Sequence, residues 1–196
     1  MNQFTLGEAL DQIKEQLKSY IDDGIQKVII DLRHSPGGNS QAGLELLGVM
    51  DMTPPSFGNF ERFSEPLKKQ YPDRDMPLYP IRRTHRNEAN LEIASNPRGI
   101  ELAVLTSEYT FSSGTMFATW VQDGNLGTVV GSISGNAPNS YGDLISVDLE
   151  HTGTKANVSC VWWERPDHTA SPKELVPDIE VPKEEALEKA LEYLHQ

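Results

Sequence analysis

The spacing of apolar residues near the start of the chain predicts an amphipathic helix followed by a buried strand. Apolar side chains recur at helical intervals from Leu6 to Ile21, and Gly24 then supplies a left-handed stop. Thr5 and Glu8 have the spacing of a capping box, which predicts that the helix begins there. Residues 27–33 form an apolar strand that ends in an acid and a base, so we expect a structural ion pair at the strand end.

The same two patterns alternate along much of the remaining chain. Helices are predicted over residues 40–50, from the turn at residue 112 to about residue 124, and from Pro182 to the end; strands are predicted over residues 100–106, 127–131, 143–149 and 155–164. Strands that alternate with helices favour an α/β core with parallel strands and right-handed crossovers. In 155–164, Trp162 and Trp163 should face opposite sides, one in the core and one in a cleft or contact surface.

Residues 51–99 break this regularity. The segment is rich in proline and shows no sustained apolar period. It is interpreted as an irregular excursion, either a lid over a site or a floppy insertion, and the sequence does not choose between them. With 196 residues in all, we expect one domain over 1–196 that includes this insertion.

The stretch from Thr110 to Thr115 is the first candidate for chemistry. Its serines and glycine lie between a buried strand and a helix, so the Ser112 hydroxyl is expected at a helix N-terminus. Free N–H groups and the helix dipole favour developing negative charge there, which suits a nucleophile. Serine is also an ordinary N-cap residue, and both readings stay open.

A second candidate stretch follows the strand over residues 27–33. Gly37 and Gly38 come after a proline, and such a turn brings backbone N–H groups close to a ligand. Together with the serine turn, it would supply a nucleophile and an oxyanion hole. His34 lies in the same loop and is the best local candidate for a general base, although a solvated loop histidine is the alternative.

Composition narrows the classes of function. A net charge of −12 argues against nucleic acid as a partner, and no apolar run is long enough for a membrane span. The first residues lack the pattern of a signal peptide. The single cysteine, Cys160, excludes an internal disulfide and is interpreted as a buried structural thiol. We find no metal-binding or nucleotide-binding motif, and expect neither a metal nor another cofactor.

Four segments, in this order, resemble the C-terminal processing (tail-specific) serine proteases. They are residues 4–38 with Asp-Leu-Arg-x-x-Pro-Gly-Gly, 103–124 with Thr-x-Ser, 128–135 with Thr-x-Val-Gly-x-x-x-Gly, and the Arg-Pro-Asp and Pro-Asp-Ile-x-Val motifs within 163–181. The resemblance covers most of the chain outside residues 51–99. It implies a crotonase/ClpP-like core, a polypeptide substrate, and a bacterial cell-envelope or secreted setting.

Residue by residue, the resemblance implies that Ser112 is the nucleophile. The backbone N–H groups of Ser113 and of Gly37 or Gly38 would then form the oxyanion hole. Where one branch of the family has a lysine, this chain has Asn136, whose amide has no useful basicity. The stretch Ser-Tyr-Gly-Asp over residues 140–143 resembles a different, Gram-positive and Bacteroides-like branch more than the lysine-using one.

The base is therefore expected from His34 or from upstream sequence. The family's peptide-binding PDZ-like module and the opening strand of its core would precede residue 4, and this chain is expected to lack them. Asp143 is interpreted as a residue that orients a base or binds substrate, as Asn136 could, with a plain turn residue as the alternative.

Three functions follow from these features. The first is a serine peptidase that works through an acyl-enzyme. The second is an inactive relative that binds peptides or small hydrophobic ligands in the same cleft. The third is an assembly domain, since α/β cores of this kind lend themselves to subunit packing and a homo-oligomer is one expected state.

Overall fold

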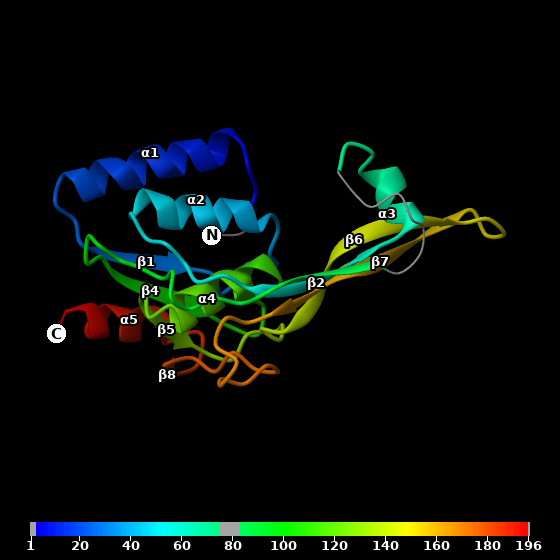
Figure 1. Ribbon diagram of the computed structural model, residues 1–196. Helices are drawn as coiled ribbons and strands as arrows, with labels where there is room; N and C mark the ends of the chain where they lie inside the picture. Colours follow the sequence, from blue (N-terminus) through cyan, green and yellow to red (C-terminus); the bar gives the residue numbers. More distant parts are fainter. Residues whose placement is uncertain (1–2, 75–82, 196) are drawn as a thin grey trace.

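The computed structural model describes residues 3–74 and 83–195, and these residues form two four-stranded sheets. The first sheet is parallel and carries the bulk of the apolar core. The second is antiparallel and extends away from the first (Figure 1). The expected α/β fold, with a mostly parallel sheet and flanking helices, is confirmed.

The parallel sheet has the strand order β1 (Lys27–Asp31), β4 (Glu101–Thr106), β5 (Thr128–Gly131) and β8 (Ile179–Glu180). Its two inner strands, β4 and β5, are almost wholly buried. Near-continuous apolar runs of this kind are typical of parallel strands covered on both faces.

Helices cover both faces of this sheet. The helices α1 (Glu8–Asp22), α2 (Ser40–Val49) and α4 (Ser113–Asp123) share the larger apolar cluster, to which β4 contributes Leu102 and Val104. The alternate residues of β4 face the opposite side and pack against α5 (Ala186–Leu194). Figure 1 shows α1 and α2 on one side of the sheet and α5 on the other.

The antiparallel sheet has the order β3 (Arg83–Asn87), β2 (Gly58–Phe63), β7 (Thr154–Glu164) and β6 (Ser140–Leu149). The helix α3 (Glu65–Gln70) packs on this sheet through Leu67, which is fully buried against Ile145. Within the described residues, no helix is long and apolar enough to cross a membrane.

Three local expectations differ from the structure. The segment 51–99 is less irregular than expected, because β2 and β3 gain their partners from the distant strand β7 and from each other. The first helix has Gly7 at its N-cap, with φ 124° and no side-chain cap, so the capping box at Thr5 is wrong. The last helix begins at Ala186 and not at Pro182, which starts a short turn.

Candidate active site

Ser112 lies at the junction between the strand β4 and the helix α4, in an unusual backbone conformation. Its φ is 50° and its ψ is −121°, a region that residues other than glycine rarely occupy. The side chain is exposed, and although Ser112 holds the N-cap position it makes no capping hydrogen bond. An ordinary N-cap has an extended backbone and a capping hydrogen bond, and Ser112 has neither; a strand-to-helix elbow that presents a hydroxyl matches it better.

Hydrogen bonds that the serine turn donates to the loop after β1 hold this strained turn in place. The Thr110 hydroxyl donates to the carbonyl of Leu32 at 2.8 Å, and the N–H of Phe111 donates to the carbonyl of Ser35 at 2.9 Å. Thr110 and Ser35 are fully buried. The conformation of Ser112 therefore depends on a loop that is distant in the sequence.

The glycine pair of that loop touches the serine turn directly. Gly37 and Gly38 have φ values of 100° and 133°, and a Cβ added at Gly37 would lie 2.6 Å from the Cβ of Ser112. The Ser113 hydroxyl donates to the carbonyl of Gly38 at 2.7 Å. The expected convergence of the two loops is thus present in the structure.

The N-terminal segment fixes the other side of the glycine pair. Phe4 donates its N–H to the carbonyl of Gly37 at 2.8 Å and accepts from the N–H of Asn39 at 2.8 Å. A Cβ at Gly38 would lie 1.9 Å from the Phe4 carbonyl oxygen, so only glycine fits there. Phe4 itself is fully buried against Phe117 of α4.

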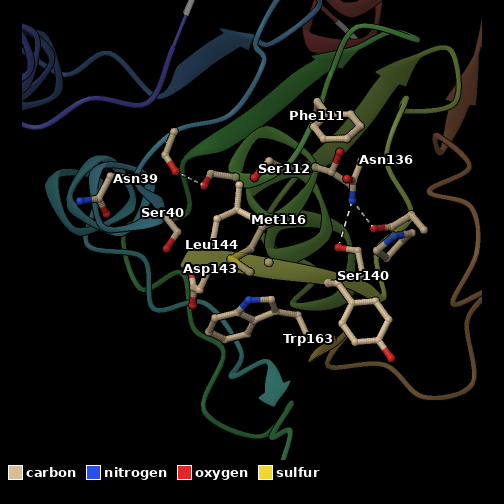
Figure 2. A pocket seen from close by; sticks show the side chains of 17 residues that line it. Asn39, Ser40, Phe111, Ser112, Met116, Asn136, Ser140, Asp143, Leu144 and Trp163 are labelled. Carbon is tan, nitrogen blue, oxygen red and sulfur yellow. Dashed lines mark hydrogen bonds between the residues drawn. The ribbon is translucent and has the colours of Figure 1, made fainter. Parts of the chain in front are cut away.

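Both loops open into a cavity of about 600 Å³. Figure 2 shows Ser112, Phe111 and Met116 on one side of this cavity, with Ser140 and Trp163 on the other. Gly38 and Ser113 also line the cavity. Ser113 is the first residue of α4, and N–H groups in the first turn of a helix have no partner within the helix.

Asn136 and Asp143 line the same cavity. The side-chain amide of Asn136 donates to the carbonyl of Ala137 at 2.6 Å and to the hydroxyl of Ser140 at 3.1 Å. Both amide protons are therefore engaged in shaping the loop. The side-chain oxygen of an amide can accept a hydrogen bond, but it cannot serve as a base.

Asp143 has a perturbed carboxyl group in the cavity wall. Loss of hydration raises the pKa of Asp143, and the nearby negative charge of Glu61 raises it further, while Arg74 acts in the opposite direction. Its backbone is also strained, with φ 52° within the strand β6. Strain and a shifted pKa at one position are typical of functional sites.

His34 lies apart from this group. Its side chain is exposed, its ring stacks on Tyr109 with centroids 6.0 Å apart, and it is not among the residues that line the cavity. Its role as a base stays a prediction, as do the roles of the other candidates. The expected ion pair of Asp31 and Arg33 is present at 2.7 Å and locks the end of β1.

A second cavity of about 340 Å³ adjoins the first, and sequence reasoning did not identify it. The two cavities share Asp143, Leu144 and Trp163 in their walls. A bidentate ion pair between Glu61 and Arg74, with one contact at 2.8 Å, also lines the second. The pair joins β2 to a turn beyond α3, and no local sequence pattern predicts such a contact.

The tryptophan pair and the cysteine can be placed as well. Trp163 faces the cavity and packs edge-on against Phe57, whereas Trp162 lies on the opposite face against Tyr141, as the alternation of β7 predicted. Cys160 is only partly buried, and its thiol donates to the carbonyl of Asp143 at 2.8 Å. Burial, with the charge of Asp143, raises the pKa of Cys160, so the thiol stays protonated.

Solved structures with a similar fold include proteases and one lipoprotein. The mature protein CPAF, solved with lactacystin, matches with a TM-score of 0.63 at 14% identity, over 100% of this chain and 49% of its own. The photosystem II D1 C-terminal processing protease matches with a TM-score of 0.60 at 16% identity, over 94% of this chain and 42% of its own. A lipoprotein from Streptococcus agalactiae matches with a TM-score of 0.57 at 12% identity, over 97% of this chain and 62% of its own.

The TM-scores show a shared fold, and at these low identities the likeness extends to the fold alone. The chain spans 42 to 62% of the length of these three structures. Among curated proteins, no significant sequence match is found. The family model of peptidase family S41 matches residues 1–181, which is nearly the whole sequence. This chain therefore belongs to peptidase family S41.

Proposed function

We propose that this chain carries the nucleophile and the oxyanion hole of a serine peptidase that cleaves polypeptides through an acyl-enzyme. The Ser112 hydroxyl would attack the carbonyl carbon of the scissile bond, passing its proton to a base and then to the departing amine. Water would then hydrolyse the resulting ester. The backbone N–H groups of Ser113 and of Gly37 or Gly38 would bind the oxyanion of each tetrahedral intermediate.

One observation carries this proposal. Ser112 has a strained, exposed position without a capping bond, in the wall of a cavity and against the glycine pair. A serine that served only its own helix would relax to an ordinary cap, because the positive φ costs about 1–3 kcal/mol. Membership of a peptidase family supports the general class of reaction.

The base is the element that the proposal leaves to experiment. His34 belongs to the loop of the glycine pair, and a group from outside residues 1–196 is the alternative. A general base contributes about 10²- to 10⁴-fold to the rate. If His34 is the base, His34→Ala will slow serine acylation by a factor in that range; an unchanged rate assigns the base elsewhere.

A fluorophosphonate probe tests the nucleophile. We expect labelling of the wild-type chain, none of Ser112→Ala, and unchanged labelling of Ser140→Ala. Ser140 is a matched control, because it presents a second hydroxyl to the same cavity. Labelling that persists in Ser112→Ala, at a site mapped elsewhere by mass spectrometry, would refute the proposal.

Asn136 favours a second candidate, an inactive relative that binds peptides in the same cavity. It stands where the lysine-using branch has its base, and both of its amide protons are engaged in the loop. Peptide binding that survives Ser112→Ala, with no probe labelling and no turnover by the wild type, would select this function over the first.

A further inference from the structure

The second cavity adjoins the first cavity, which holds Ser112, and shares part of its wall. Asp143, Leu144 and Trp163 line both cavities, and Figure 2 shows their side chains in the wall of the first. With a volume of about 340 Å³, the second cavity has room for one long side chain. A polypeptide that lies in the first cavity against Ser112 therefore has a place beside it for one of its own side chains.

The charged groups of the second cavity leave one carboxylate without a partner. Arg74 donates to both carboxylate oxygens of Glu61, one of them at 2.8 Å, so these two charges neutralise each other. Within residues 3–74 and 83–195, no side chain or backbone group donates a hydrogen bond to the carboxylate of Asp143, and no cation forms an ion pair with it. Two carboxylates and one guanidinium line this cavity, and the excess negative charge lies on Asp143.

The chain keeps this carboxylate although it is unfavourable for folding. Loss of hydration, and then the charge of Glu61, raise the pKa of Asp143, and the opposite effect of Arg74 is smaller. The backbone φ of Asp143 is 52°, and the pairing of β6 with β7 is interrupted there, since the paired positions pass from Gly142 directly to Leu144. A strained backbone and a disfavoured charge at one position are typical of a residue that serves binding. A cation bound beside Asp143 would relieve its repulsion by Glu61.

The remaining wall of the second cavity suits the alkyl stem of a basic side chain. Leu67 is fully buried at this wall, and the side chains of Leu144 and Trp163 add further apolar surface. Lysine and arginine pack their methylene groups along apolar surface and carry their charge at the tip. An apolar wall next to one unpaired carboxylate therefore matches these side chains in both polarity and charge.

We propose that the second cavity is a specificity subsite that binds a lysine or arginine side chain of the polypeptide substrate, with Asp143 as the carboxylate that pairs with it. The proposal rests on the proposed function, which supplies the polypeptide in the first cavity. Because Asp143 lies in the wall that the two cavities share, the basic residue is close to the scissile bond. An acidic residue in the same place would meet two carboxylates and be rejected.

Titration of the Ser112→Ala chain with peptides, followed by NMR, tests the subsite without cleavage. The probes are acetylated, amidated Ala-Ser-Ala-Lys-Ala-Ser-Ala and the same peptide with norleucine in place of lysine, which keeps the four-carbon stem and lacks the charge. The flanking residues let each peptide shift until its central residue reaches the subsite. We expect the lysine peptide to bind about tenfold more tightly, the effect of one charge-assisted hydrogen bond. It should also shift the indole N–H signal of Trp163, which lines both cavities.

Asp143→Asn, added to the same chain, removes the charge and keeps the shape of the side chain. Asparagine tolerates a positive φ, and the loss of a carboxylate whose pKa is raised should leave the free energy of unfolding unchanged or increase it. In this variant we expect the lysine peptide to bind no better than the norleucine peptide. Asp148→Asn is the matched control, because Asp148 is an exposed acid on the same strand and lines neither cavity. It should retain the preference for lysine.

Three results would overturn the proposal. They are equal affinity for the two peptides, a preference for lysine that persists in Asp143→Asn, and no binding of either peptide at millimolar concentration. The fluorophosphonate result is independent. A preference for lysine without labelling retains the subsite and refutes the peptidase, whereas labelling without that preference refutes the subsite alone.

Discussion

Replacing Gly37 by alanine tests whether the two loops meet as the structure describes. The new methyl group would lie 2.6 Å from the Cβ of Ser112, 2.8 Å from the carbonyl oxygen of Phe111 and 3.0 Å from the backbone nitrogen of Ser113. Two of these three neighbours are backbone atoms and cannot rotate away. The serine turn must therefore move, or the glycine loop must.

The expected loss of stability has two parts. Alanine at a φ of 100° is strained by about 1–3 kcal/mol, and forcing the close contacts adds about 1–3 kcal/mol. Gly24→Ala separates these parts, because Gly24 has a φ of 96° but nothing within 4 Å of its added Cβ. Both substitutions stiffen the unfolded chain alike, so the difference between them reports the contact alone, about 1–3 kcal/mol.

Urea unfolding of the wild type and of the two variants measures that difference. The same proteins are then treated with the fluorophosphonate probe, for which we expect labelling of Gly37→Ala to be slower by about 100-fold, the effect of a misplacement of about 1 Å. Gly24→Ala should be labelled at the wild-type rate. If Gly37→Ala is no less stable than Gly24→Ala and reacts as fast as the wild type, the two loops are not in contact and the site is wrong.

Three further predictions concern single interactions. Ser113→Ala removes the hydrogen bond to the Gly38 carbonyl and should lower the free energy of unfolding by about 1 kcal/mol, with slower probe labelling as the check that the glycine turn has shifted. Arg165 and Asp123 form a buried ion pair, and Arg165→Met leaves the Asp123 carboxylate buried without its partner. Urea unfolding should show that the free energy of unfolding falls by about 3–5 kcal/mol; an unchanged value would mean that the pair is solvated. The hydrogen bond from the Arg33 guanidinium lowers the pKa of Asp31 below its usual 3.8. The ion pair therefore stabilises the fold above pH 3.8, and this contribution is lost as the pH falls through the lower folded pKa. Between about pH 4 and that pKa the urea midpoint of the wild type should therefore drop more steeply than that of Asp31→Asn; parallel curves would exclude the effect.

The sequence was most informative where local pattern and burial agree. The inner strands β4 and β5 are almost wholly buried, and the near-continuous apolar runs that such burial requires are visible without any structure. The ion pair at the end of β1 and the opposite faces of Trp162 and Trp163 follow from spacing alone. These features depend on residues that are close in the chain.

The features that were missed depend on distant partners. The strand β2 has no clear alternation and becomes a strand through β7, roughly 100 residues later. Glu61 and Arg74 are paired only because the turn beyond α3 folds back on β2. The positive φ of Ser112 is likewise invisible in the sequence, since the surrounding contacts, and not the serine itself, impose it.

The joining of the two loops has a consequence for when reactivity can arise during folding. Ser113 and Gly38 are 75 residues apart in the chain and follow the paired strands β4 and β1, so their contact forms only when these distant segments meet. A nascent or partly unfolded chain holds the same side chains but not the elbow on which the proposed reactivity of Ser112 depends. Under the proposed function, the protein would therefore cleave no other polypeptide until its long-range contacts are complete, and it would lose activity early when these contacts begin to open.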